Sequence, residues 1–194
     1  MGIIIGLTGP TGAGKSLVSS VAAQQGYQVI DCDLAARRAV ERNSEGLLSL
    51  IKVFGDEILN SDGTLNRKAL AKRAFSAKEN TQLLNETLLP HIVKLIESEM
   101  VSDKVLLDAP TLFESGIDKK CTVTVAVLAD REERKRRILE RDCINEQEAE
   151  LRMGAGKEDD FYRRRADFVI YNNKGTADFK NEFIKFLEAL TEVK

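Results

Sequence analysis

The stretch that decides the fold is residues 3–16, with the sequence IIIGLTGPTGAGKS. Its first half is a short apolar run, which is typical of a parallel strand buried on both faces. A glycine-rich turn follows, and a helical pattern continues from about Lys15 to about Gln25. A buried strand that leads through such a turn into a helix predicts the beginning of an α/β protein.

Further apolar runs extend this pattern along the chain. They lie at 28–30, 105–107, 123–127 and 168–171. Each is short and rich in β-branched or aromatic residues, and helical patterns separate them. Strands that alternate with helices form βαβ units with parallel strands. The sequence therefore predicts an α/β fold with a doubly wound, parallel five-stranded sheet.

The remaining segments predict helices. The span 44–100 holds no convincing strand and is expected to be a helical lobe. Two places match the pattern of an N-cap residue followed by an acidic residue at the third helical position: Asp130 with Glu133, and Asn145 with Glu148. We therefore expect helices to start at both places.

The turn at 9–16 matches the phosphate-binding pattern G-x-x-x-x-G-K-S/T, between a strand and a helix as this motif requires. Its glycines let backbone N–H groups curl around phosphate oxygens, and the N-terminus of the next helix faces the same phosphates. Lys15 would reach the β- and γ-phosphates, and the Ser16 hydroxyl would bind Mg²⁺. We therefore predict a P-loop that binds a nucleoside triphosphate.

Kinases, GTPase switches and ATP-driven motors all use such a loop. A guanine-reading switch carries N-K-x-D, but residues 173–176 read NKGT; it also carries D-x-x-G, but residues 108–111 read DAPT. A transport ATPase would need a longer chain. A small-molecule kinase fits better, and it needs a second carboxylate for the metal, a base for the acceptor hydroxyl and cations for the transferred phosphoryl group.

Two predicted strands end in carboxylates that suit these roles. Asp108 ends the run 105–107 and would hold Mg²⁺ beside the P-loop, directly or through water. Asp33 follows the run 28–30, at the sheet edge where doubly wound folds bind ligands. It is expected to orient or deprotonate the acceptor hydroxyl, to cap the next helix, or to do both, with Asp31 in a supporting role.

The charged stretch 131–141 places Arg134, Arg137 and Arg141 on one helical face. Guanidinium groups match phosphate oxygens in bidentate geometry. The interleaved glutamates also fit a solvated surface helix with i,i+4 ion pairs. We predict that at least one arginine contacts phosphate, and that Arg141 does so because it lies toward the end of the helix.

Composition excludes several other classes. The 194 residues carry 29 basic and 31 acidic side chains, and a net charge of −2 does not suit a generally basic nucleic-acid binder. Three well-separated cysteines predict reduced thiols, and no apolar run is long enough for a membrane span. We therefore expect a cytoplasmic protein without nucleic-acid or membrane partners. His91 is expected to be structural or on the surface, and Cys32 a small apolar filler.

Over nearly its whole length the chain resembles the dephospho-coenzyme A kinase family of P-loop kinases. The resemblance rests on specific segments besides the P-loop: VIDCD at 29–33, FG at 54–55, DGTLNR at 62–67, LFESG at 112–116, RD at 141–142, AD at 166–167 and NN at 172–173. It implies phosphorylation of the ribose 3′-hydroxyl of dephospho-coenzyme A by ATP, with coenzyme A and ADP as products, in the last step of coenzyme A synthesis.

The resemblance also implies a division of the chain and a set of site residues. The nucleotide-binding core would comprise 1–32, 105–130 and 160–194, with a helical substrate-binding lobe at 33–104 and a lid at 131–159. Asp33 would be the base, and Lys15 and Arg141 the phosphate cations. The ATP loop would comprise Gly12, Ala13, Gly14, Lys15, Ser16 and Leu17, and Asn172 or, by preference, Asn173 would lie near the adenine.

The physical argument alone leaves the acceptor open, because acceptor choice depends on the shape of the helical lobe. Another small-metabolite kinase of the same architecture, acting on a nucleoside, a nucleoside monophosphate or shikimate, is the alternative. A nucleotide-binding switch is a third interpretation, which the absent guanine- and γ-phosphate-sensing residues disfavour. The oligomeric state is not predicted.

Overall fold

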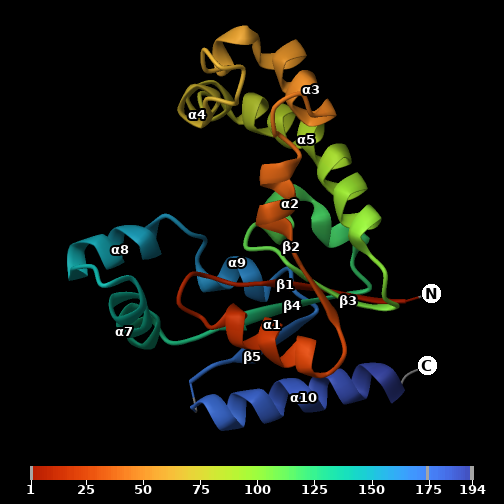
Figure 1. The fold of residues 1–194 in the computed structure, drawn as a ribbon. Helices are drawn as coiled ribbons and strands as arrows, with labels where there is room; N and C mark the ends of the chain where they lie inside the picture. The colour runs from red at the N-terminus through yellow and green to blue at the C-terminus, as the bar shows by residue number, and fades with distance from the viewer. Residues whose placement is uncertain (1, 174, 193–194) are drawn as a thin grey trace.

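The computed structural model describes residues 2–173 and 175–192, and its centre is a five-stranded parallel sheet (Figure 1). The strand order is β2-β3-β1-β4-β5, and every neighbouring pair is parallel. The strands are β1 (Ile3–Thr8), β2 (Gln28–Asp31), β3 (Lys104–Asp108), β4 (Val123–Leu128) and β5 (Phe168–Tyr171). The predicted fold class is thus confirmed.

Helices cover both faces of the sheet. Figure 1 shows α1 and α10 together on one side and α2 and α9 on the other. Their bounds are α1 (Lys15–Gln24), α10 (Thr176–Glu192), α2 (Cys32–Arg38) and α9 (Asp159–Arg163). Within the described ranges, no helix is both long enough and apolar enough to cross a membrane.

Alternation along the strands supplies an apolar core to each face. Leu106 of β3 packs in the cluster that includes Phe179 and Phe183 of α10. Its neighbours Val105 and Leu107 pack in the opposite cluster, with side chains of α2 and α5 (Lys78–Glu99). This pattern explains why the strands read as nearly continuous apolar runs.

A helical lobe stands above the sheet (Figure 1). It consists of α3 (Glu45–Phe54), the 3-10 turn η1 (Asp56–Ile58), α4 (Arg67–Ala74) and the first half of α5. Its buried cluster is Val40, Leu50, Phe54, Ile58, Leu70 and Ala74. The helical character predicted for 44–100 holds, apart from one isolated bridge between Leu59 and Leu65.

Two helices form a separate hairpin at the carboxyl edge of the sheet (Figure 1). They are α7 (Arg131–Asp142) and α8 (Glu146–Gly154), joined by a small apolar cluster. The expected capping box of Asn145 and Glu148 starts α8. α7 starts after Asp130 as expected, but the Asp130 carboxylate makes no cap: it accepts from Asn173 Nδ2 at 2.8 Å. The chain between β3 and β4 forms α6 (Leu112–Ser115) and η2 (Ile117–Lys120).

Candidate active site

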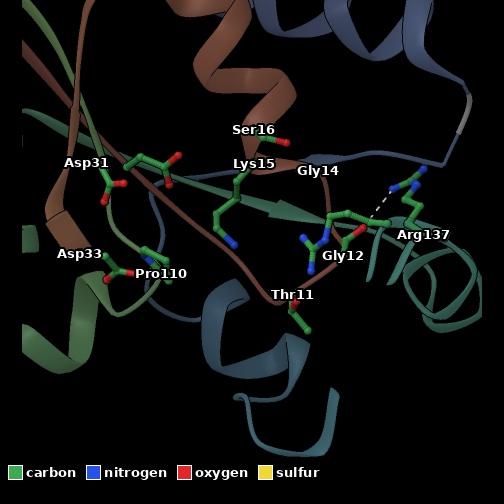
Figure 2. Close-up of a pocket in the computed structure, with 11 residues that line it drawn as sticks. Thr11, Gly12, Gly14, Lys15, Ser16, Asp31, Asp33, Pro110 and Arg137 are labelled. Carbon is green, nitrogen blue, oxygen red and sulfur yellow. Dashed lines mark hydrogen bonds between the residues drawn. The ribbon is translucent and has the colours of Figure 1, made fainter. Parts of the chain in front are cut away.

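A cavity of about 380 Å³ lies where β1, β2 and β3 end (Figure 2). Parallel strands present their carboxyl ends at one edge, so residues far apart in the sequence meet there. The lining residues are Thr11, Gly12, Gly14, Lys15, Ser16, Asp31, Asp33, Asp108, Pro110, Arg137 and Arg141. The structure therefore brings together the predicted cations, carboxylates and P-loop.

The P-loop conformation depends on glycine at two positions that contact other segments. Gly12 has φ +79, and a Cβ there would lie 2.7 Å from the carbonyl oxygen of Arg134. Gly14, the N-cap of α1, has φ +105, and a Cβ would lie 2.3 Å from Asn172 Nδ2. Any other residue would be strained and would push the loop away from α7 and from Asn172, the residue that follows β5.

Lys15 occupies the middle of the cavity. Figure 2 shows it with Asp31 and Asp33 on one side and Arg137 on the other. Its ammonium donates to the Gly9 carbonyl at 2.7 Å. Burial lowers the pKa of Lys15, while the negative charges of Asp108 and Asp33 act in the opposite direction.

The carboxylates on one side of the cavity are placed by the sheet and by a helix cap. Asp31 and Asp108 are partners in the register of β2 and β3. Asp31 also caps α2 by accepting from Leu34 N at 3.0 Å. The cap that we considered for Asp33 is therefore wrong: α2 starts two residues earlier than that role requires, and Asp33 lies in its first turn.

This arrangement leaves the Asp33 carboxylate available to a substrate. Partial removal from water raises the pKa of Asp33, and the nearby charge of Asp31 raises it further, while Arg37 acts in the opposite direction. A raised pKa makes a carboxylate a stronger proton acceptor, as a general base requires. Asp33 thus has the location and the electrostatic surroundings that this role needs.

The three arginines of the predicted helical face have three different environments. Arg134 is buried and pairs with Asp159 at 3.2 Å, away from the cavity. Arg137 donates to the carbonyl of Asn172 at 2.8 Å and, more weakly, to those of Gly12 and Ala13, both at 3.4 Å. It therefore ties α7 to the P-loop.

Arg141 reaches the cavity with its guanidinium held by the next residue in the chain. Its Nε and Nη2 donate to the two carboxylate oxygens of Asp142 at 2.7 and 2.9 Å, and its side chain is 62% exposed. Those bonds raise the pKa of Arg141. Because the Arg141 side chain is exposed, a phosphate oxygen could replace Asp142 as its partner, and Asp142 would keep its ion pair with Arg152.

Four predicted nucleotide-binding residues do not line this cavity. Ala13 is fully buried, and Leu17 packs against the core beneath α1. Asn172 is buried and donates to the Ala13 carbonyl at 2.9 Å, so it supports the P-loop from behind. Asn173 binds Asp130 through both its side-chain oxygen and its side-chain nitrogen. Their contacts with a nucleotide stay a prediction.

Sequence reasoning missed Ser19, which contacts a cavity residue. Its hydroxyl lies 2.7 Å from Asp108 Oδ2. The available signal was that Ser19 follows Lys15 by four residues, on the same helical face. His91 lies in the second half of α5, with its Nε2 3.0 Å from Ser49 Oγ of α3, and does not line this cavity. Cys32 is buried, as expected of a filler.

The residues predicted to hold Mg²⁺ fit that ion. The Ser16 hydroxyl is in the first turn of α1, and both Ser16 and Asp108 line the cavity. Both offer hard oxygen ligands, and Mg²⁺ usually takes one or two ligands from protein and the others from water and phosphate oxygens. Ser16 and Asp108 would therefore leave coordination positions open for a nucleotide.

A P-loop at the edge of a parallel sheet, with carboxylates and cations around one cavity, defines the class: this is an ATP-dependent kinase of the P-loop group. Comparison with known proteins specifies it further. The model of the family described as dephospho-CoA kinase matches residues 3–178. The chain belongs to the dephospho-CoA kinase family.

Relatives from distant organisms support the assignment. The dephospho-CoA kinase of Listeria monocytogenes is 36% identical over 200 residues, covering 100% of both chains. That of Corynebacterium glutamicum is 38% identical, covering 97% of this chain and 98% of the relative. That of Arabidopsis thaliana is 35% identical, covering 95% of this chain and 82% of the relative.

Solved structures share the fold. A protein from Thermus thermophilus aligns with a TM-score of 0.78 and 32% identity over 97% of each chain. The dephospho-CoA kinase of Campylobacter jejuni has a TM-score of 0.53 and 22% identity over 96% of each chain. A shikimate kinase from Acinetobacter baumannii has a TM-score of 0.54 and 17% identity, covering 99% of this chain and 94% of that one. At such low identity, the last two comparisons concern the fold alone.

Proposed function

We propose that this protein transfers the γ-phosphoryl group of ATP to the ribose 3′-hydroxyl of dephospho-coenzyme A, forming coenzyme A and ADP. The observation that carries the proposal is that the P-loop lysine, Lys15, lines one cavity together with the carboxylates Asp33 and Asp108. Membership of the dephospho-CoA kinase family indicates that the acceptor is dephospho-coenzyme A. This is the final step of coenzyme A biosynthesis.

In this reaction Asp33 takes the proton of the 3′-hydroxyl while the hydroxyl oxygen attacks the γ-phosphorus. The bond from phosphorus to the β,γ-bridging oxygen breaks, and ADP leaves with the electron pair. Lys15 and Arg141 neutralise charge on the transferred group, as phosphoryl transfer requires. Mg²⁺, held by Ser16 and Asp108, would offset charge on the β- and γ-phosphates.

The division of the chain is part of the proposal. We assign nucleotide binding to 1–32, 105–130 and 160–194, acceptor binding to 33–104, and the lid to 131–159. The separate apolar clusters of the lobe and of the α7–α8 hairpin support it, because each can move with its own core intact. Three free cysteines support action in the reducing cytoplasm.

A coupled assay of ADP release tests the acceptor. ATP and Mg²⁺ are supplied with dephospho-coenzyme A, and in parallel with AMP, UMP, adenosine or shikimate. We expect strong stimulation by dephospho-coenzyme A alone, with the product phosphate at the 3′ position by NMR. Stimulation by another acceptor and none by dephospho-coenzyme A would contradict the proposal.

A further inference from the structure

Ser19 lies on α1, one turn beyond Lys15 and Ser16, and does not itself line the cavity. Its hydroxyl has two acceptors within reach: Asp108 Oδ2 at 2.7 Å and the Lys15 carbonyl oxygen at 3.2 Å. A hydroxyl has one proton to donate. The carboxylate is nearer and charged, so it receives the stronger bond.

This bond joins two elements that meet only in the folded protein. Asp108 ends β3, 89 residues away from Ser19 in the sequence. In the part of the chain that the structure describes, Ser19 makes the one recorded hydrogen bond to the Asp108 carboxylate. The bond uses Oδ2 and restrains rotation of the carboxylate, so Oδ1 is left to act as an acceptor or ligand.

A neutral donor has a specific advantage here. A lysine bound to Asp108 would compensate its negative charge and compete with a cation, whereas a serine orients the carboxylate and leaves its charge in place. The nearby Lys15 ammonium is bound instead to the Gly9 carbonyl, at 2.7 Å. Asp108 is therefore oriented by one group without being neutralised by it.

We propose that Ser19 is a positioning residue that holds Asp108 in the orientation needed to bind Mg²⁺ together with the nucleotide. The proposal rests on the metal role in the proposed function, and it does not depend on which acceptor is phosphorylated. Residues that orient a metal ligand commonly affect metal affinity by about 10- to 100-fold. We expect the lower end, because a single hydroxyl is involved.

The experiment measures how much Mg²⁺ strengthens nucleotide binding, with no acceptor present. The Kd of a non-hydrolysable ATP analogue is determined by calorimetry in Mg²⁺ and again in EDTA, and the ratio is the metal enhancement. Ser19→Ala should lower this enhancement about tenfold and leave the Kd in EDTA unchanged. Ser20→Ala is the matched control, because Ser20 is the next residue on α1 and is exposed.

A double-mutant cycle distinguishes positioning from a general effect on the helix. In an Asp108→Ala background, Ser19→Ala should cause no further loss of metal enhancement. Ser19→Thr, which keeps a hydroxyl, should retain the enhancement, and thermal unfolding establishes that each variant is folded.

Three results would overturn the proposal. The metal enhancement of Ser19→Ala could lie within twofold of that of Ser20→Ala. Ser19→Ala could cause its full loss of metal enhancement even in the Asp108→Ala background. Ser19→Thr could also lose as much metal enhancement as Ser19→Ala. If Asp108→Ala itself left the enhancement unchanged, Asp108 would not bind the metal and Ser19 would have nothing to position. None of these outcomes depends on dephospho-coenzyme A, so failure of the acceptor assignment is seen separately.

Discussion

The two sides of the cavity are built in different ways. On the carboxylate side, Asp31 and Asp108 end neighbouring strands, and strand register sets their separation. On the opposite side, Arg137 and Arg141 extend from α7, whose packing against α8 rests on the small cluster Ile138, Ala149 and Met153. The carboxylates are therefore fixed by the sheet, whereas the arginines belong to a peripheral hairpin.

The partners of the charged groups differ in the same way. Asp31 holds a helix N-terminus, and Asp108 accepts from Ser19 across two elements. Arg141 is paired with its chain neighbour Asp142 at an exposed position, where ion pairs contribute little. In the proposed mechanism, Mg²⁺ would therefore bind a preorganised carboxylate, Asp108, whereas the transferred phosphate would be neutralised partly by Arg141, a cation that can change partner.

The largest effect is expected at Lys15, where the two sides meet. Lys15→Ala removes the central cation, so kcat/KM should fall by at least about 10³. The fold should persist, because the lysine side chain is bound to a loop carbonyl and not packed in the core. Steady-state kinetics and circular dichroism check both expectations, and near-normal turnover would remove the P-loop lysine from the mechanism.

The next effect tests the carboxylate side. Asp33→Asn keeps the shape of the side chain and removes the base, so kcat should fall about 10²- to 10⁴-fold. The Kd of ATP should change little, because Asp33 acts on the acceptor. If thermal stability dropped and kcat did not, Asp33 would have a structural role only.

A smaller effect tests the arginine side. Arg141→Ala should lower kcat about 10²-fold by removing one cation from the transferred phosphoryl group. Arg136→Ala is the matched control on the same helix, because Arg136 is exposed and pairs only with Glu133 and Glu140 among the described residues. Equal losses of kcat in the two variants would show that only the overall positive charge of α7 affects turnover.

The smallest effect is a shift in the pH profile. Asp33 must be unprotonated to accept a proton, so kcat/KM should fall as pH falls through the pKa of Asp33. Burial and then Asp31 raise that pKa, so Asp31→Asn should move the acid limb to lower pH. Asparagine also caps helices well, so α2 should be preserved. An unchanged midpoint would contradict the proposed coupling.

The P-loop and the carboxylate side could be predicted because their signals are local. Residues 9–16 form a contiguous motif, and Asp108 directly follows an apolar run. The cap was assigned to Asp33 and not to Asp31, because the two aspartates differ by only two positions and the residue pattern does not mark where the helix begins. Only the backbone conformation places Asp31 at the N-cap.

The arginine side was predicted less completely for a different reason. Helical periodicity places three arginines on one face but says nothing of the segment that each meets. Arg134 finds Asp159 of α9, and Arg137 finds carbonyls of the P-loop and of Asn172. Asn173 is likewise directed to Asp130 and not to the cavity. Such partners depend on how distant segments pack.

The sequence by itself determined the chemistry, because a phosphate-binding loop needs only neighbouring residues with the right backbone freedom and charge. It also determined the alternation of strands and helices, through the local spacing of apolar side chains. Tertiary structure alone decided the strand order β2-β3-β1-β4-β5, and with it the pairing of Asp31 with Asp108 and the contact of Ser19 with Asp108. These contacts join residues far apart in the chain, and they form only when the whole sheet assembles.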